Sequence, residues 1–357
     1  MRETRTSGSE GRETGNSTGL PYPYRTVSVI PNMLVLHKRP KRQRKYRVQH
    51  LAYSPDGRWL AGAVYRTLRE DWPTETNGQL LLWDLRAPGG PWQVLERPCR
   101  HAVARVAWLG SNDPERLVAM TTDARLFLWD TSPLLLAEAR LTRDDTMWPT
   151  DLVAADAGTI LCSRASPYHE RPGRVVAIQW SDDRGEAFLL RENVLRRVPE
   201  GVWSIAVCPG GETVALGLRD AISLRAAPQM EDEIGRLRHQ GYVRHLAFSP
   251  DGQRLASAGG WRVRLWDLNR PSGRVQRELK GHGKEVTSIA WSPDGRFLLS
   301  GSLDETVRLW DTRSGRPIDC YDWGTGAVRS LAFSPDGTTA AVGGSKRDSI
   351  VVWDVEV

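Results

Sequence analysis

Residues 281–311 read GHGKEVTSIAWSPDGRFLLSGSLDETVRLWD, and this stretch decides the fold. It holds three short runs rich in β-branched and apolar residues, namely Glu285–Trp291, Phe297–Ser302 and Thr306–Asp311. Tight polar turns separate these runs, and residues 316–321 (RPIDCY) add a fourth run after a Ser-Gly turn. Such runs between turn signals, without a helical period, predict a meander of four antiparallel β-strands.

The same unit recurs along the whole chain. Its SPDG turn is found four times, at Ser54–Gly57, Ser249–Gly252, Ser292–Gly295 and Ser334–Gly337, with a weakened copy at Cys208–Gly211. Trp-Asp pairs follow these turns, at Trp83-Asp84, Trp129-Asp130, Trp266-Asp267, Trp310-Asp311 and Trp353-Asp354. Two eroded copies hold Trp180-Ser181 and Leu224-Arg225 in the same place.

These marks define seven units, because they are spaced by 42 to 51 residues. One four-stranded sheet is too small to bury both of its faces. Seven such sheets packed face to face around an axis can bury them, and a ring leaves few exposed edges. The sequence therefore predicts an all-β ring of seven sheets.

The units resemble the WD40-repeat β-propeller family over nearly all of residues 30–357. In that family a Gly-His, a Ser or Thr, an Asp and the Trp of the third strand form a hydrogen-bonded tetrad. The sixth unit has all four side chains, and the resemblance implies a structural tetrad of His282, Ser300, Asp304 and Trp310. A buried indole N–H and a carboxylate–imidazole pair are tolerable there only when fully hydrogen-bonded.

The other units are incomplete copies of this pattern. The second keeps Asp123 and Trp129, the fifth keeps His239 and Trp266, and the fourth has lost nearly everything. Repeated SPDG turns combined with many degenerate blades are typical of prokaryotic-style members of the family.

The two chain ends predict how the ring closes. Only Val355–Val357 follow the last Trp-Asp pair, too few for a fourth strand. Residues 27–37 (VSVIPNMLVLH) have strand character, so we expect them to pair with the last blade. Residues 38–47 then form a basic linker, and the blades occupy about 46–357, so that the propeller domain spans 20–357. Residues 1–19 hold 11 Gly, Ser or Thr and are expected to form a disordered tail.

Composition limits the class of protein. The 357 residues carry a net charge of +6, and no apolar run approaches the length of a spanning helix. The four cysteines lie far apart without a C-x-x-C motif, which argues against disulfide scaffolds and zinc modules. The first residues lack the apolar core of a secretory signal. We expect a soluble, cytoplasmic protein without membrane attachment, a monomer within a larger complex.

The chain carries little that points to catalysis. It has no G-x-S-x-G, H-E-x-x-H, G-x-G-x-x-G or Walker motif. His282, Asp304 and Ser300 have the residue types of a Ser-His-Asp triad, but parts of the set recur in other units, which favours structure over catalysis. We predict no enzyme activity, no cofactor and no metal site.

Candidate binding residues gather at one end of the predicted ring. In an antiparallel meander, turns between second and third strands and links between blades share one rim, opposite the SPDG turns. We call it the opposite rim. Two long insertions, residues 65–78 and 164–174, belong to it. Four aromatic side chains map there and are the candidate site for a protein partner: Trp72, Tyr168, Tyr242 and Trp261.

The linker at 38–47 is a candidate basic patch of seven cations without an acid: Lys38, Arg39, Lys41, Arg42, Arg44, Lys45 and Arg47. The rest of the chain has 42 basic against 43 acidic residues, so this segment carries the net charge. It fits a solvated linker, a contact with an acidic protein surface, or salt-sensitive binding to nucleic-acid phosphates. We predict a non-catalytic protein–protein interaction scaffold, with a nucleic-acid-contacting subunit of a larger complex as the alternative.

Overall fold

The computed structural model describes residues 34–35, 46–67, 76–86, 93–99, 101–109, 116–129, 135–141, 148–156, 159–165, 173–181, 188–198, 201–227, 230–269, 275–346 and 350–355. The predicted tail at 1–19, most of the predicted closing strand and most of the basic linker lie outside these residues. Within the described residues every regular element is a β-strand.

The strands form seven four-stranded antiparallel sheets, which we call blades 1 to 7 in chain order. Blade 1 contains β2 (Tyr46–Tyr53), β3 (Trp59–Thr67), β4 (Thr76–Asp84) and β5 (Gln93–Cys99). Blade 2 contains β6 (Val103–Trp108), β7 (Leu117–Thr121), β8 (Arg125–Trp129) and β9 (Leu135–Arg140). Blade 3 contains β10 (Trp148–Ala154), β11 (Thr159–Ala165), β12 (Gly173–Ser181) and β13 (Phe188–Val198).

The second half of the chain repeats the arrangement. Blade 4 contains β14 (Ser204–Val207), β15 (Thr213–Gly217), β16 (Arg219–Ala226) and β17 (Glu233–Tyr242). Blade 5 contains β18 (His245–Phe248), β19 (Arg254–Gly259), β20 (Arg262–Asp267) and β21 (Val275–Lys280). Blade 6 contains β22 (Val286–Trp291), β23 (Phe297–Ser302), β24 (Val307–Asp311) and β25 (Pro317–Tyr321). Blade 7 contains β26 (Val328–Phe333), β27 (Thr339–Gly344), β28 (Ile350–Asp354) and β1 (Leu34–Val35).

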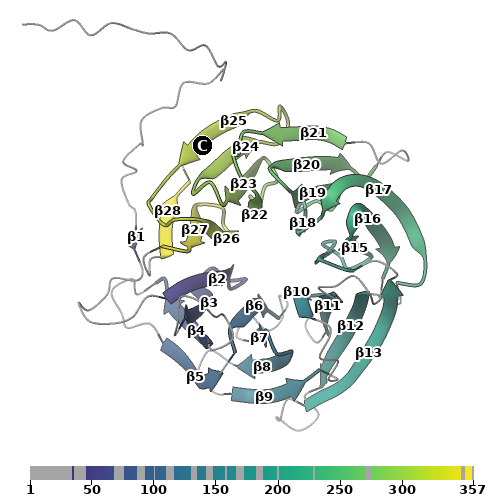
Figure 1. The fold of residues 1–357 in the computed structure, drawn as a ribbon, viewed down its shortest axis with the longest axis vertical. Helices are drawn as coiled ribbons and strands as arrows, with labels where there is room; N and C mark the ends of the chain where they lie inside the picture. Colours follow the sequence, from purple (N-terminus) through teal and green to yellow (C-terminus); the bar gives the residue numbers. More distant parts are fainter. Residues whose placement is uncertain are drawn as a thin grey trace, which may run out of the picture.

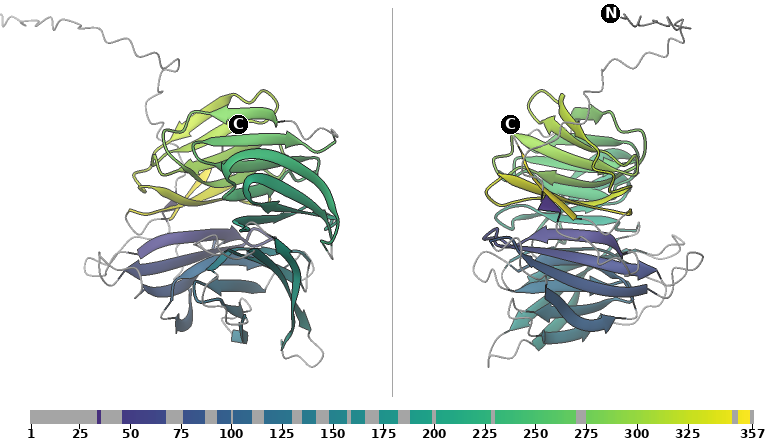
Figure 2. Two further views of the ribbon diagram at one scale, coloured as in Figure 1. Left: turned by 45° about the vertical axis from the view of Figure 1, so that its right-hand side comes forward. Right: turned by 90° about the vertical axis from the view of Figure 1, so that its left-hand side faces the viewer.

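The blades are arranged around a central axis, with the first strand of each blade innermost (Figure 1). Each inner strand contacts the next one in order, and β26 of blade 7 also contacts β2 of blade 1. Figure 2 shows the same ring from the side, with the N-terminal blades below and the C-terminal blades above. The all-β propeller architecture predicted from the repeats is confirmed.

The closing strand is described at two residues. Leu34 and Val35 pair antiparallel with β28, opposite Val352 and Val351. They therefore lie beside the last blade, where the sequence placed them, and they precede blade 1 in the chain. The remainder of the predicted strand at 27–37 lies outside the described residues.

The hydrophobic core lies between neighbouring blades rather than within one layer. Leu60 and Trp83 of blade 1, for example, pack in one cluster with Ala341 and Val352 of blade 7. These four side chains are at most 6% exposed, so the first and last blades share a buried apolar junction. Removing apolar surface of this kind from water is the main force that holds a repeat ring together.

The SPDG turns share one hydrogen-bond pattern. In blade 6 the Oγ of Ser292 donates to Asp294 Oδ1 at 2.5 Å and accepts from the backbone N–H of Phe297 at 2.9 Å. The N–H of Gly295 donates to the carbonyl of Ser292, and Gly295 has a φ of +68°, which favours glycine. The turns that begin at Ser54, Ser249 and Ser334 repeat this pattern.

Polar side chains on the inner strands connect one blade to the next. Ser288 Oγ accepts the backbone N–H of Leu331 at 3.0 Å, and Ser330 Oγ accepts that of Leu51 at 2.9 Å. The second of these bonds joins blade 7 to blade 1. The residue opposite Ser330 is Gly343, where a Cβ would come within 2.3 Å of Val48 in the next blade, so glycine is required there by close packing.

The two predicted insertions are shorter loops than the sequence suggested. Tyr65 pairs with Gly78, and Arg164 pairs with Arg174, so both ends of each predicted loop extend the β-hairpin. The alternation of apolar and polar residues that marks a strand is hard to recognise in polar stretches such as Tyr65–Thr67 and Thr76–Gly78. The loop tips between these pairs, at 68–75 and 166–172, lie outside the described residues.

Candidate functional site

The structure brings the four predicted tetrad side chains of blade 6 together. Ser300 Oγ lies 2.7 Å from both His282 Nε2 and Trp310 Nε1, and His282 Nδ1 lies 2.9 Å from Asp304 Oδ2. Asp304 also accepts the backbone N–H of Gly283. Ser300 is fully buried, so no substrate meets its hydroxyl, and the arrangement supports the blade rather than a reaction.

The tetrad carboxylate is ionised over a wide pH range. Burial alone would raise the pKa of Asp304, but hydrogen bonds from His282 and Thr306 outweigh burial and hold that pKa well below its ordinary value of 3.8. The charged form of Asp304 is therefore part of the folded structure at neutral pH.

Blade 5 uses the same residue types differently. Trp266 Nε1 donates to Ser257 Oγ at 2.8 Å, but His239 Nε2 lies 3.1 Å from Arg264 Nη1 instead of a serine. The turn from Gly260 to Trp261 is too short to hold an aspartate in the place of Asp304. The buried His239 Nδ1 consequently has no hydrogen-bond partner of normal geometry among the described residues.

Blade 2 contains a histidine, beside the aspartate of the tetrad position, that the sequence reasoning missed. It does not complete a tetrad, because its side chain is 47% exposed and the buried Trp129 Nε1 has no hydrogen-bond partner among the described residues. His101 Nε2 lies 3.7 Å from Asp123 Oδ2, and Thr121 Oγ1 donates to Asp123 Oδ1 at 2.6 Å. Trp129 is buried in the same blade, as expected from its place in the third strand. The signal in the sequence was a histidine two residues before the inner strand, without the preceding glycine of the Gly-His pair.

Two of the four predicted rim aromatics are described, and both lie on the opposite rim. Trp261 forms the turn between β19 and β20 and is 64% exposed. Tyr242 is the last residue of β17, shortly before the inner strand β18, and it is half-buried. The backbone carbonyl of Tyr242 abuts Gly259, next to the turn that holds Trp261. Trp72 and Tyr168 lie outside the described residues.

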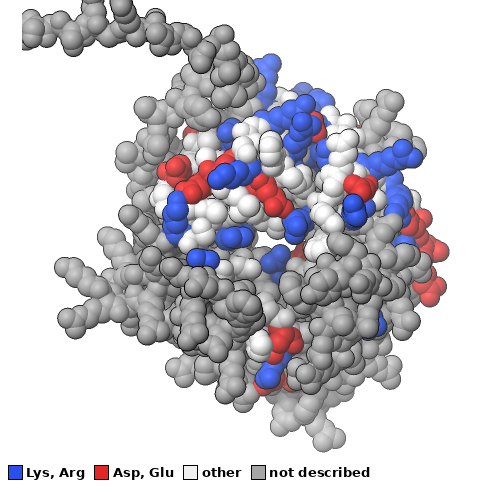
Figure 3. Space-filling model, in the orientation of Figure 1, with Lys and Arg blue, Asp and Glu red and all other residues white. Residues whose placement is uncertain are grey.

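The rim around Tyr242 holds a cluster that the sequence did not single out. Trp203 contacts Tyr242 edge to face, with ring centroids 5.1 Å apart. The Arg244 guanidinium lies 5.5 Å from the Trp203 ring and 5.7 Å from the Tyr242 ring, and Arg219 lies 5.6 Å from the Tyr242 ring. We call these four residues the rim cluster. Figure 3 shows Lys and Arg, with Asp and Glu among them, over β17 to β21 on the face turned to the viewer.

The two arginines of the rim cluster lie at the surface, where each forms an ion pair as well as its contact with an aromatic ring. Arg244 is exposed and pairs with Glu285 at 2.7 Å, with side chains 46% and 36% exposed. Arg219 pairs with Asp220 at 3.5 Å, and both side chains are 62% exposed. Exposed pairs of this kind contribute little to stability and rearrange readily on binding.

Of the predicted basic patch, the described residues include only Arg47. It lies at the start of β2 and is exposed. The other six cations lie outside the described residues, so the structure places no second member of the patch beside it.

Polar and charged side chains of the innermost strands lie near the axis of the ring. His50, Arg105 and Asp151 occupy the same position of their strands, directly after a shift in the pairing register. Arg105 Nε lies 3.0 Å from Asp151 Oδ1, whose other oxygen accepts the N–H of Ile205 at 3.1 Å. Burial, and then the charge of Arg105, lower the pKa of His50 and of His245 from 6.5 to about 3, so both imidazoles are neutral at pH 7. These contacts run from blade to blade, which indicates a structural role.

The described residues contain no group of three His, Cys, Asp or Glu side chains that could hold a metal ion. Cys162, Cys208 and Cys320 form no disulfide within the described part of the chain. In the part of the chain that the structure describes, there is also no helix whose length and apolar character would let it cross a membrane.

Comparison with known proteins supports the repeat assignment. The family described as "WD domain, G-beta repeat" matches residues 232–267, 273–311 and 315–354, about a third of the chain. Protein groucho of Drosophila melanogaster is 34% identical over 159 residues, which are 43% of this chain and 20% of that protein. U3 small nucleolar RNA-associated protein 15 homolog of Gallus gallus is 36% identical over 107 residues, 30% of this chain and 20% of that protein.

A third relative is small ribosomal subunit protein RACK1y of Oryza sativa subsp. japonica, 36% identical over 121 residues, 33% of this chain and 34% of that protein. The chain thus spans between a fifth and about a third of the length of these relatives. The matched repeats coincide with the best-preserved blades, which hold the complete tetrad and three of the SPDG turns. The chain therefore carries WD40 repeats, and its resemblance to the WD40-repeat β-propeller family is confirmed.

Proposed function

We propose that this protein is a non-catalytic scaffold that docks protein partners on its opposite rim. The observation that carries the proposal is the exposed Trp261 beside the rim cluster of two aromatic rings and two arginines. Trp, Tyr and Arg side chains supply most of the binding energy at protein interfaces, because they bury much area at modest entropic cost. A rigid ring also presents these side chains with little backbone change on binding.

The relatives support this class of function in general terms. Their printed names place one in a ribosomal subunit and one in association with a small nucleolar RNA, so WD40-repeat proteins of this kind are parts of larger assemblies. We extend this to the present chain as a monomer within a complex, located in the cytoplasm and without a cofactor.

The test is affinity purification of the full chain from its native host, with mass spectrometry of the captured proteins. The variant combines Tyr242→Ala with Trp261→Ala. Its matched control is Ile318→Ala, because Ile318 is an exposed apolar residue, 45% accessible, on the outer strand β25. We expect the rim variant to lose specific partners that the wild type and the control retain. Retention of every partner by the rim variant would refute docking at this rim.

A second candidate function is contact with nucleic acid through residues 38–47. The seven clustered cations favour it, as does the printed name of the relative associated with a small nucleolar RNA. Such binding depends on phosphate neutralisation and weakens steeply as salt rises. The variant replaces Lys41, Arg42, Arg44 and Lys45 by Gln, and binding to a labelled single-stranded oligonucleotide is measured between low and physiological salt. Binding that is absent at low salt, or unchanged in the variant, would exclude this candidate.

A further inference from the structure

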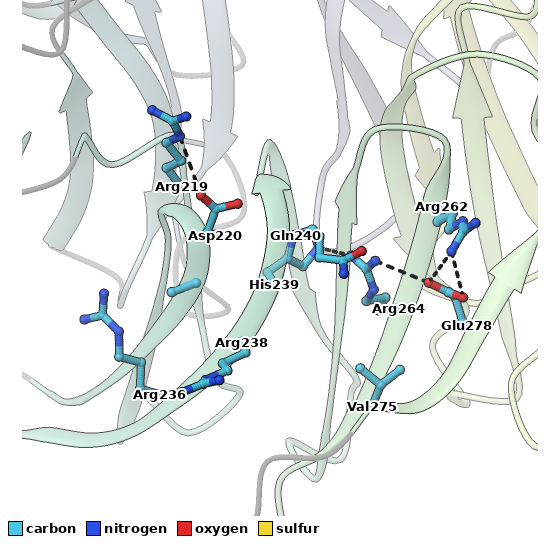
Figure 4. A pocket seen from close by; sticks show the side chains of 11 residues that line it. Arg219, Asp220, Arg236, Arg238, His239, Gln240, Arg262, Arg264, Val275 and Glu278 are labelled. Carbon is cyan, nitrogen blue, oxygen red and sulfur yellow. Dashed lines mark hydrogen bonds and ion pairs between the residues drawn. The ribbon is translucent and has the colours of Figure 1, made fainter.

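A long groove runs down the outer side of the ring between blades 4 and 5. Its volume is about 1290 Å³, and its walls come from the start of β16, from β17, and from β20 with β21 (Figure 4). It extends from Arg262, which pairs with Lys280 near the opposite rim, to Val275, which pairs with Trp266. Three residues of β20 lie between Arg262 and Trp266, a rise of about 13 Å, so the groove is long enough for about four residues of extended chain.

The groove is strongly cationic. Five arginines line it, namely Arg219, Arg236, Arg238, Arg262 and Arg264, against the two carboxylates of Asp220 and Glu278. Glu278 is already shared, since it lies 3.1 Å from Arg262, 3.3 Å from Arg264 and 3.1 Å from Lys280. One carboxylate thus faces three cations, and the groove keeps an excess of positive charge.

The arginines of β17 follow the alternation of the strand. Arg236, Arg238 and Gln240 are exposed, whereas Leu237 and His239 between them are buried. Side chains at i, i+2 and i+4 of a strand point to one face, about 6.6 Å apart. Arg238 has no ion-pair partner among the described residues, and Arg236 lies 3.6 Å from Glu233, whose carboxylate also binds Arg225 at 2.8 Å.

The floor of the groove is fixed. Arg264 is 8% exposed and is held between His239 Nε2 at 3.1 Å and Glu278 at 3.3 Å. A guanidinium only donates, so His239 Nε2 must accept and the ring proton sits on Nδ1. Burial, and then the positive charge of Arg264, lower the pKa of His239 to about 4, so the ring stays neutral at pH 7. The buried cation is therefore rigid, while the arginines above it are exposed.

We propose that this groove binds an extended acidic peptide segment of a partner protein, in which acidic residues alternate with apolar ones. Acidic side chains at alternate positions match the spacing of Arg236 and Arg238, with which carboxylates form charge-assisted hydrogen bonds. The apolar side chains between them match Val275, which lines the groove and is 40% exposed. A nucleic-acid backbone suits the groove less well, because its evenly spaced phosphates would also face Asp220 and Glu278.

The groove adjoins the rim that carries the proposed function and shares Arg219 with the rim cluster, but the residues varied in the two tests are different. Arg236 and Arg238 lie on the outer strand of blade 4, whereas Tyr242 and Trp261 lie at the end of that strand and in a turn of blade 5. Variants of one surface therefore leave the other intact, and failure of one proposal is distinguishable from failure of the other.

The test measures binding of a fluorescein-labelled peptide of about ten residues, in which Asp alternates with Val, to the full chain by fluorescence anisotropy. The groove variant is Arg236→Ala with Arg238→Ala. The matched control is Arg277→Ala with Arg313→Ala, which removes the same charge from exposed positions outside the groove. A peptide with Asn in place of Asp controls for charge.

We expect the Asp peptide to bind the wild type and the control, the Asn peptide to bind neither, and the groove variant to bind the Asp peptide at least about tenfold more weakly. Both double variants should melt within about 2 °C of the wild type, because all four side chains are exposed. Equal weakening in the control, or no weakening in the groove variant, would overturn the proposal. Displacement of the peptide by inorganic phosphate alone at matched ionic strength, or tighter Arg236-dependent binding of an oligonucleotide of equal charge, would overturn it too.

Discussion

Replacing the tetrad carboxylate by Asp304→Ala should lower the free energy of unfolding by about 3 kcal/mol at pH 7. The carboxylate accepts hydrogen bonds from His282 Nδ1 at 2.9 Å, Gly283 N at 2.8 Å, and Thr306 N and Oγ1 at 3.0 and 2.7 Å. Gly283 is exposed and Thr306 is half-buried, so water can replace the carboxylate there. The His282 side chain is only 1% exposed, so its ring N–H would lose the ionised acceptor and keep only the weaker Thr306 Oγ1, 3.3 Å from Nδ1, and this loss accounts for most of the cost.

Urea unfolding followed by tryptophan fluorescence measures this cost. Its control is Asp322→Ala, which removes an exposed carboxylate that accepts one backbone N–H, from Gly324 at 2.8 Å. We expect the control to cost less than about 1 kcal/mol, as exposed positions usually do. A loss below about 1 kcal/mol for Asp304→Ala would refute the interpretation of the tetrad as a source of stability.

The pH dependence of the same variant gives a second check. The pKa of Asp304 is held below 3.8 in the folded state, so its contribution is fully present above pH 3.8 and is lost as pH falls from there toward the folded pKa. The stability difference between wild type and Asp304→Ala should therefore be constant from pH 7 to about 5 and shrink near pH 3. A difference that does not change down to pH 3 would contradict this reasoning.

Three further predictions concern the junctions between blades. Ser330→Ala should cost about 1 to 3 kcal/mol in urea unfolding, because the N–H of Leu51 loses its acceptor at the junction of first and last blades; a neutral effect would count against this link. Gly343→Ala should cost about 1 to 3 kcal/mol in the same assay, because its Cβ would meet Val48 at 2.3 Å, and an unchanged midpoint would contradict the packing. The pKa of His50 falls from 6.5 to about 3, so the stability it supports is complete above pH 6.5 and is lost as pH falls toward 3. His50→Asn should reduce the change in the free energy of unfolding between pH 7 and pH 5 by about 2 kcal/mol, and an unaltered pH dependence would refute this.

The sequence alone predicted the repeat architecture well, because the features that define a blade are local. The turn at Ser292–Gly295 needs a serine, an aspartate and a glycine at fixed offsets, and the structure uses each of them. A Trp near the end of the third strand, which six of the seven units have, is likewise a local mark of the blade, and in blade 4 Leu224 takes its place. Such signals survive in a single sequence, whereas contacts between blades leave none.

The candidate surfaces were less predictable, because they depend on contacts between residues that are far apart in the sequence. Trp203 precedes an inner strand, and nothing in its sequence position indicates that it packs beside Tyr242, which comes from the outer strand of the same blade. The groove between blades 4 and 5 joins Arg238 to Arg264, which meet only when two blades pack side by side. The alternation of Arg236, Arg238 and Gln240 was visible in the sequence, but only the neighbouring blade shows that this face lines a groove.

The most direct test of the proposed docking rim is site-specific photocrosslinking in the native host. A benzophenone amino acid replaces either Trp261 on the opposite rim or Pro250, which is exposed in the SPDG turn of the same blade. Docking through the opposite rim predicts discrete crosslinked partners from position 261 and none of these from position 250. Identical adducts from both positions, or partners captured only from position 250, would contradict the proposal.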